Sequence, residues 1–180
     1  MKIRLAADLQ TDSIVDGLGI RTVIWTQGCS HNCPNCHNPG THDFDGGELV
    51  EIEDVIEALE DLTGQDGVTF SGGDPMFQPK QCALLAKKIH ELGMNVWAYT
   101  GFTFEELLEK GSKDTLEFLS EIDVLIDGKF EPSKKSLDLQ FRGSSNQRII
   151  DVPKSLENHK TILFNLNKKI ETKKKENIYI

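Results

Sequence analysis

The stretch IRTVIWTQGCSHNCPNCHNPG, from Ile20 to Gly40, decides how the rest of the chain is interpreted. Its first part, IRTVIWTQG, is rich in β-branched and aromatic residues and ends in glycine, which predicts a strand from Ile20 to Gly28. Three cysteines, Cys29, Cys33 and Cys36, follow this strand directly. The segment therefore predicts a strand whose carboxyl end carries a loop with three thiols.

A loop with three thiols indicates a reactive iron–sulfur site. A cube of four irons offers four positions for thiolates, so three sulfurs leave one iron open to bind a substrate or cofactor directly. The remaining cysteine, Cys82, lies among Ala and Leu in QCALLAKKIHEL, a segment with helical apolar spacing. We expect Cys82 to be a small buried core residue and not a metal ligand.

The composition indicates one globular domain. Of the 180 residues, 38% are hydrophobic and 27% are charged, and a chain of this length can bury a sizeable core. We expect the domain to span residues 1–165 and a basic, solvated tail to follow at 166–180. The net charge of -9 and the pI near 5.0 argue against a nucleic-acid partner, because phosphate backbones are held by clustered Lys and Arg.

The amino terminus shows no charged-then-apolar leader, and no apolar run approaches the ~20 residues that cross a bilayer. We therefore expect a cytoplasmic protein with no membrane partner. Thiols stay reduced in the cytoplasm, which favours metal binding over disulfides.

Short β-rich runs alternate with amphipathic helical runs along the chain. The apolar spacing predicts helices at 50–62, 79–92 and 104–120, and strands at 20–28, 67–73, 94–101 and 122–128, with QRIIDV and KTILFN as further candidate strands. Repeated βα units with buried strands imply a parallel sheet with right-handed crossovers. Because a closed eight-stranded barrel takes about 250 residues, we expect an α/β fold with an incomplete (β/α)5-6 parallel barrel, open on one side.

Every conspicuous motif falls at the carboxyl end of an expected strand. The cysteine loop follows the first strand, and SGGDP, YTG and DGKF follow the next three. Because α/β folds place their sites at this edge, four motifs at one rim predict one site.

The residue types at this rim suggest roles. Gly72 and Gly73 leave room for a ligand beside the backbone, and Asp74 adds an acceptor that suits an ammonium group. Taken alone, GGDP is also a common sequence for a turn, because Gly, Asp and Pro are frequent turn residues. Thr100 and Asp127 are oxygen donors for a cation or polar ligand, although an aspartate at a strand end is as often a cap or turn former.

These residues carry a resemblance to a known superfamily. The pattern Cys29-x-x-x-Cys33-x-x-Cys36 after the first strand, with SGGDP after the second, resembles the radical S-adenosylmethionine superfamily. Within it, DGLGIRTVIWTQGC, CPNCHNP, SGGDP and FRGSSNQRI are similar to the activating components of anaerobic, class III ribonucleoside-triphosphate reductases. The resemblance covers residues 14 to about 150, most of the chain.

The resemblance implies a partial barrel of the radical S-adenosylmethionine type, with a [4Fe-4S] cluster on Cys29, Cys33 and Cys36 whose open iron chelates S-adenosylmethionine. The residues implied to contact this cofactor are Asn35, Cys36 and His37 along the adenine, Gly72, Gly73 and Asp74 at the methionine amino group, and Thr100 and Asp127 at the carboxylate end. Asn35 stands where the superfamily often has an aromatic residue, so adenine stacking by this side chain is not implied.

The resemblance also implies an activity and partners. A one-electron donor such as a flavodoxin or ferredoxin reduces the cluster, and S-adenosylmethionine is cleaved to methionine and a 5′-deoxyadenosyl radical. That radical takes a hydrogen atom from a glycine of the partner, the glycyl radical subunit of an anaerobic ribonucleoside-triphosphate reductase. No catalytic residue is expected beyond the cluster and cofactor, and family likeness suggests a homodimer. Asp16 and Arg21 are candidate contacts to the glycine loop, or ordinary turn and surface charges.

Three alternatives compete with this interpretation. CPNCH matches a covalent haem attachment pattern, but it explains neither Cys29 nor SGGDP. Three thiolates with His31 or His37 match a structural zinc site, which would make the protein a binding module. A radical enzyme that acts on a small molecule would share the same cysteines. Apart from the zinc alternative, we expect the five histidines to be surface or capping residues.

Overall fold

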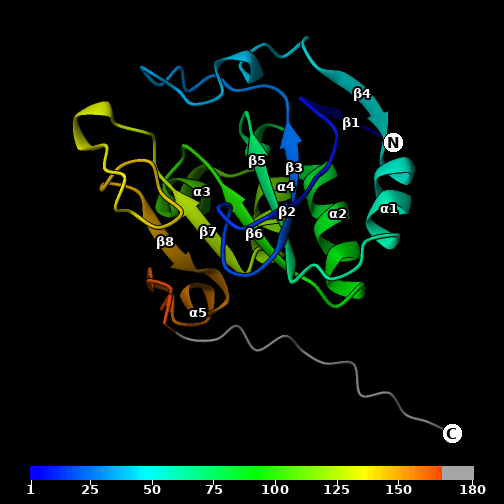
Figure 1. The fold of residues 1–180 in the computed structure, drawn as a ribbon. Coiled ribbons are helices and arrows are strands. Elements are labelled where there is room, and N and C mark those ends of the chain that lie inside the picture. Colours follow the sequence, from blue (N-terminus) through cyan, green and yellow to red (C-terminus); the bar gives the residue numbers. More distant parts are fainter. Residues whose placement is uncertain (168–180) are drawn as a thin grey trace, which may run out of the picture.

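The computed structural model describes residues 1–167, whose strands form one mixed sheet of eight strands (Figure 1). The sheet order is β4-β1-β3-β5-β6-β7-β8, and β2 pairs with β3 beside this path. The strands are β1 (Lys2–Leu5), β2 (Gln10–Ser13), β3 (Arg21–Thr26), β4 (Glu48–Glu51), β5 (Gly67–Gly72), β6 (Asn95–Tyr99), β7 (Val124–Asp127) and β8 (Arg148–Asp151). The helices are α1 (Ile52–Glu60), α2 (Pro79–Glu91), α3 (Phe104–Lys110), α4 (Lys113–Ser120) and α5 (Val152–Glu157).

The central strands β3, β5, β6 and β7 pair in parallel, as expected from the alternation of β and helical runs. Val23 lies beside Thr69, Thr69 beside Trp97, and Trp97 beside Val124. The carboxyl ends of all these strands therefore meet at one edge of the sheet, from which the loops with the sequence motifs emerge.

The expectation of five or six parallel repeats was wrong. Strand β8, expected from QRIIDV, runs antiparallel to β7, and KTILFN contributes only an isolated bridge between Leu163 and Ile150. A parallel return needs a crossover that is usually a helix, whereas the segment 128–147 contains only the short 3-10 turn Pro132–Lys134. The sheet ends at β4 on one side and at β8 on the other, so it is open.

Helices α1 to α4 pack against one face of the sheet; in Figure 1, α3 and α4 lie behind the strands and α1 and α2 stand to their right. The segment 104–120 forms two helices because α3 is closed at Gly111 and the side chain of Ser112 caps α4. A capping box between Thr103 and Glu106 begins α3. Cys82 is fully buried in this helix-side core, and burial raises the pKa of its thiol, as expected for a core cysteine.

The opposite face of the sheet is filled below the rim by Trp97 and Arg21, which are both fully buried. The Arg21 guanidinium lies 5.2 Å from the Trp97 ring and donates to Thr69 Oγ1 at 2.6 Å and to Val68 O at 2.8 Å. Burial lowers the pKa of Arg21 to about 10. Arg21 is therefore an internal support and not the exposed charge that the sequence suggested.

No helix within residues 1–167 is both long and apolar enough to span a membrane. The expected basic tail, 166–180, falls outside the described residues from position 168 onward.

Candidate active site

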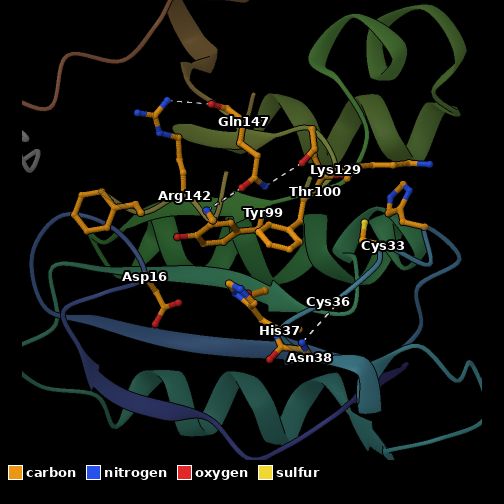
Figure 2. A pocket seen from close by; sticks show the side chains of 18 of the residues that line it. Asp16, Cys33, Cys36, His37, Asn38, Tyr99, Thr100, Lys129, Arg142 and Gln147 are labelled. Atoms are coloured by element: carbon orange, nitrogen blue, oxygen red, sulfur yellow. Dashed lines mark hydrogen bonds between the residues drawn. The ribbon is translucent and has the colours of Figure 1, made fainter. Parts of the chain in front are cut away.

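A cavity of about 760 Å³ opens at the carboxyl edge of the sheet (Figure 2). Its walls come from the cysteine loop, from the ends of β5 and β6, and from the segment 128–147. Cys29, Cys33 and Cys36 all line the cavity, whereas Cys82 lies in α2 on the other side of the sheet. This volume is in the range of about 300–1,000 Å³ that small-molecule and cofactor sites occupy.

Backbone hydrogen bonds hold the start of the cysteine loop between two neighbouring segments. On one side, Gly28 N donates to Thr41 O at 2.8 Å and Cys29 N donates to His42 O at 3.1 Å. On the other side, Asp74 N donates to Gly28 O at 3.0 Å. The loop that carries the first thiol is thus fixed to the SGGDP turn, which confirms that these two motifs meet at one rim.

The three thiols are half-buried. Burial raises the pKa of Cys29 to about 11. The backbone N–H of Asn38 donates to Cys36 Sγ at 3.4 Å, which orients this sulfur (Figure 2). Within residues 1–167, no three His, Cys, Asp or Glu side chains gather closely enough to hold a single metal ion. In a four-iron cube each thiolate binds a different iron, so three separated thiols on one cavity wall fit such a cluster.

Gly72 and Gly73 line the cavity, but the structure gives a further reason for glycine at both positions. A Cβ on Gly72, whose φ is +100°, would lie 2.4 Å from Thr26 O, and a Cβ on Gly73 would lie 2.4 Å from Gly28 O. The two glycines therefore let the end of β5 press against the end of β3.

Asp74 does not line the cavity, and only 1% of the residue is exposed. Its Oδ2 accepts hydrogen bonds from Thr100 Oγ1 and Gly101 N, both at 2.9 Å, and lies 2.7 Å from His31 Nε2. Its Oδ1 accepts from Met76 N at 2.9 Å. The structure thus uses this carboxylate to tie the site's own loops together.

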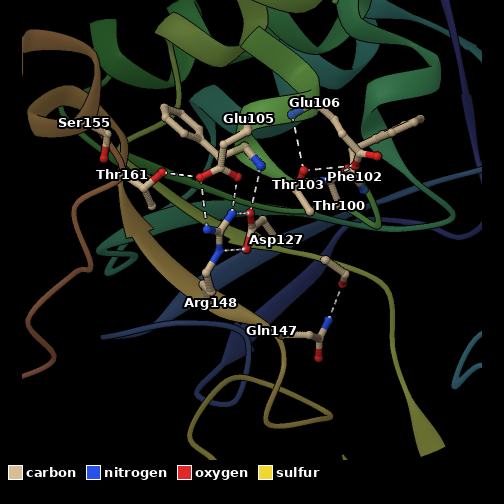
Figure 3. A network of polar contacts seen from close by, with 12 residues as sticks. Thr100, Phe102, Thr103, Glu105, Glu106, Asp127, Gln147, Arg148, Ser155 and Thr161 are labelled. Carbon is tan, nitrogen blue, oxygen red and sulfur yellow. Dashed lines mark hydrogen bonds and ion pairs between the residues drawn. The ribbon is translucent and has the colours of Figure 1, made fainter. Parts of the chain in front are cut away.

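Asp127 is likewise 1% exposed and lies outside the cavity lining. Its Oδ2 accepts from Phe104 N, in the first turn of α3, at 2.8 Å, and its Oδ1 accepts from Arg148 Nε at 3.0 Å. Arg148 also donates to both carboxylate oxygens of Glu105, at 3.1 and 2.6 Å (Figure 3). Arg148 and Thr161 lower the pKa of Glu105 to about 2 by hydrogen bonding to its carboxylate. Asp127 therefore joins β7, β8 and α3, and the structure does not bring it to the thiols.

Of the other residues expected to contact the cofactor, some line the cavity and some do not. His37 and Thr100 line the cavity, and the His37 ring packs 5.0 Å from the ring of Phe130. Asn35 is exposed outside the lining, with a φ of +55°. Asp16 lines the cavity near its mouth and is the one member of the Asp16–Arg21 pair with access to a ligand (Figure 2).

The sequence analysis placed the motifs that contain Tyr99, Lys129, Arg142 and Gln147 but assigned no role to these four side chains, which line the cavity (Figure 2). Gln147 Nε2 donates to Gly128 O at 3.0 Å, and Arg142 Nη1 donates to Gln147 O at 3.0 Å. Arg142 and Gln147 lie within FRGSSNQRI, so the motif was seen without its side chains being assigned to the site. Lys129 and Arg142 are positively charged and Asp16 is negatively charged, so the cavity wall carries charges of both signs, which suits a zwitterionic ligand.

The sequence analysis also misjudged His31. Its side chain is only 7% exposed and lies at the ends of β5 and β6, beside Asp74, instead of at the surface. No spacing rule predicts such a contact, because the pairing joins residues 43 positions apart. The one available signal was its place between two cysteines of the loop.

Comparisons with known proteins gave a matching family model, several curated relatives and a solved structure. A family model described as a 4Fe-4S single cluster domain matches residues 15–150. The anaerobic ribonucleoside-triphosphate reductase-activating protein of Pasteurella multocida is 38% identical over 147 residues, which cover 76% of this chain and 90% of the relative. Proteins of the same name from Salmonella typhi and Escherichia coli K12 are 36% and 34% identical, each over 74% of this chain and 90% of the relative. A solved structure of QueE from Escherichia coli aligns with a TM-score of 0.47 and 15% identity, over 57% of this chain and 54% of that chain.

Proposed function

The chain belongs to the family of anaerobic ribonucleoside-triphosphate reductase-activating proteins, and from this premise we propose that it generates a glycyl radical on such a reductase. The observation that carries the proposal is the opening of Cys29, Cys33 and Cys36 into one cofactor-sized cavity. The enzyme is thus an oxidoreductase that uses a [4Fe-4S] cluster and S-adenosylmethionine. The anaerobic reductase is its macromolecular partner.

We propose that Cys29, Cys33 and Cys36 hold the cluster. When bound, the cluster and S-adenosylmethionine supply one-electron reductive cleavage of the sulfonium and a hydrogen-abstracting radical. The chain's own task is to hold both groups in place and to keep water away from the reacting atoms. The bonds from Gly28 and Cys29 to the segments on either side of the loop perform the first task.

Cofactor contacts follow from which expected residues line the cavity. We propose that Cys36 and His37 approach the adenine and that Gly72, Gly73 and Thr100 approach the amino-acid end. Asn35, Asp74 and Asp127 were expected at the same cofactor, and they lie outside the lining. We propose that all three act indirectly, by shaping the loops. The hydrogen bonds of Asp74 and Asp127 are already directed at protein donors. Asn35 is exposed and has a φ of +55°, so it shapes the backbone of the cysteine loop.

The open sheet suits a large substrate. We interpret its four parallel strands as a partial barrel of the radical S-adenosylmethionine type, shorter than the five or six repeats first expected. A glycine on a loop of another protein must reach the cofactor, and hydrogen-atom transfer needs close, aligned atoms. The cavity mouth carries Ile14, Val15 and Leu137, which are exposed apolar side chains of the kind a docked loop covers.

Further parts of the proposal rest on the chemistry of the site. Thiolate ligands need a reducing compartment, so we propose a cytoplasmic location. A flavodoxin or ferredoxin is a suitable one-electron donor, and a homodimer is the assembly that the family suggests. We also propose that residues 1–165 form the working domain and that 166–180 form a basic tail outside it. We propose neither a nucleic-acid nor a membrane partner.

The first experiment tests the cysteine assignment. The protein is reconstituted with iron and sulfide without oxygen, reduced in the presence of S-adenosylmethionine, and assayed for 5′-deoxyadenosine. Changing Cys29, Cys33 or Cys36 to Ala should abolish the product, whereas Cys82→Ala should retain it. Full activity in any of the three loop variants, or loss only in the Cys82 variant, would refute the ligand set.

The same preparation separates the two alternatives. A structural zinc module would purify with one tightly held zinc and no iron–sulfur absorbance, whatever the iron supplied. A radical enzyme for a small molecule would form 5′-deoxyadenosine and leave the reductase without a glycyl radical.

A further inference from the structure

His31 belongs to the cysteine loop, lines the cavity and has a side chain that is only 7% exposed. Among the described residues, its contact with Asp74 is the single side-chain hydrogen bond that joins the segment from Cys29 to Cys36 to a strand end. The two atoms, His31 Nε2 and Asp74 Oδ2, are 2.7 Å apart. Both side chains are nearly inaccessible, at 7% and 1% exposure, so water competes little for this bond.

Asp74 accepts four hydrogen bonds within the protein itself. Besides His31 it accepts from the backbone of Met76 and from both Thr100 and Gly101 at the end of β6. Three of the four donors, including His31, bond to Oδ2 and one bonds to Oδ1, so both oxygens are engaged and the carboxylate is held in one orientation. His31 is thereby linked through one carboxylate to the ends of β5 and β6.

The surroundings of His31 are shaped to its ring. The ring of Phe102 stands edge-on at 4.5 Å and the ring of Phe77 lies at 5.8 Å. A Cβ added to Gly101 would lie 2.4 Å from His31 Cδ2, so only glycine at this position leaves space for the imidazole. The hydrogen bond to Asp74, the two aromatic contacts and the space left by Gly101 all surround the side chain of His31.

We propose that His31 is a positioning residue, which fixes the segment between Cys29 and Cys33 to the ends of β5 and β6 before the cluster binds. Ordering a flexible loop costs conformational entropy for each residue that is fixed. A loop held in advance avoids much of this cost when its thiols bind the cluster. The proposal rests on the proposed function for the identity of the bound group, but the anchoring itself is a property of the free protein.

The test compares three variants of the apoprotein by hydrogen exchange, under reducing and oxygen-free conditions. His31→Leu keeps most of the volume between the two phenylalanines and removes the polar nitrogen. His31→Gln returns an N–H donor at a reach similar to that of imidazole Nε2. Ser30→Ala is the matched control, because Ser30 is an exposed neighbour in the same loop.

We expect His31→Leu to speed exchange in the segment 28–38 about tenfold, since it removes a hydrogen bond to a carboxylate, which is stronger than a bond between neutral groups. Exchange in β5 and β6 should change little. The Gln variant should recover most of the protection, and the Ser30 variant should match the wild type. After reconstitution, the Leu variant should lose iron to a chelator about ten times faster than the wild type, as is common when an outer partner of a metal site is removed.

A second variant keeps the proposal testable if His31→Leu folds poorly. Asp74→Asn removes the charge from the other side of the pair, and by itself it should also speed exchange in the segment 28–38, while wild-type exchange there would overturn the proposal. Wild-type exchange in 28–38 for His31→Leu, or a rise that is uniform over the whole sheet, would overturn the proposal. A protein with the anchored loop that cleaves no S-adenosylmethionine would instead refute the proposed function and leave the anchor intact.

Discussion

Asp74 and Asp127 stand at the carboxyl ends of the parallel strands β5 and β7 and are equally buried, yet they serve different parts of the molecule. Asp74 collects donors from the site itself: His31 of the cysteine loop and the turn after β6. Asp127 pairs with Arg148 and with the first turn of α3, away from the thiols. The role of a buried carboxylate thus depends on its hydrogen-bond partners, and its place at a strand end does not make it a ligand for a cofactor.

Removing Asp127 should have the largest effect on stability. Asp127→Ala leaves the Arg148 guanidinium, which is 33% exposed, without its buried partner, and breaking a buried pair costs about 3 kcal/mol or more. We expect the free energy of unfolding, measured by urea denaturation, to fall by about 3 kcal/mol. The fraction of folded protein that takes up a cluster should stay at the wild-type level. A selective loss of cluster without loss of stability would place Asp127 in the site and end the contrast.

Asp74→Asn should lower stability less than Asp127→Ala does and should lower the iron content more. The amide keeps one acceptor but faces His31 or Thr100 with a poorer partner, so we expect about 1–2 kcal/mol lower stability. Iron content after reconstitution should fall about tenfold, because the support of the cysteine loop is weakened. Iron analysis beside urea denaturation measures both effects. Wild-type iron content in this variant would show that the Asp74 contacts do not support the thiols.

Gly101→Ala tests the anchor without touching a polar group. The new methyl group would lie 2.4 Å from the imidazole, while the backbone φ at Gly101 is not in the region that favours glycine. We expect a stability loss of about 1 kcal/mol, since forced displacement in a packed site costs about 1–3 kcal/mol. Exchange in the segment 28–38 should rise as it does in His31→Leu. Unchanged exchange in that segment would mean that the imidazole moves without releasing the loop.

The smallest effect concerns Glu105, which shares Arg148 with Asp127. Its pKa is lowered from 4.5 to about 2, so its contribution to stability is complete above about pH 4.5 and is lost as the pH falls to about 2. Because this carboxylate is 55% exposed, we expect Glu105→Gln to cost less than about 1 kcal/mol near neutral pH. Urea denaturation of both proteins from about pH 6 to about pH 2 should show the difference disappear. A difference that persists at the acid end would contradict this origin.

The sequence predicted the parts of the fold that depend on local patterns. The apolar runs ending at Gly28, Gly73 and Gly128 gave the parallel strands, and the cysteine spacing gave the loop. The amino-terminal strands β1, β2 and β4 were missed because each has only four residues and most of these are polar or exposed. The direction of β8 was missed because nothing in QRIIDV distinguishes a parallel partner from an antiparallel one.

The site was predicted where backbone position decides it and missed where side-chain partners decide it. Gly72 and Gly73 had to lie at the rim once β5 was placed. Whether Asp74 faces a ligand or His31 depends on a pairing across 43 residues, which no periodicity encodes. Arg21 shows the same limit, because a charge that reads as exposed is satisfied inside by Thr69, Val68 and Asn95.

The most direct test of the proposed function is electron paramagnetic resonance on an anaerobic ribonucleoside-triphosphate reductase mixed with the reconstituted, reduced protein and S-adenosylmethionine. We predict a glycyl doublet on the reductase that requires Cys29, Cys33 and Cys36 and that survives in Cys82→Ala. A reductase that stays without the doublet, while the same sample accumulates 5′-deoxyadenosine, would contradict the assignment of the reductase as the substrate.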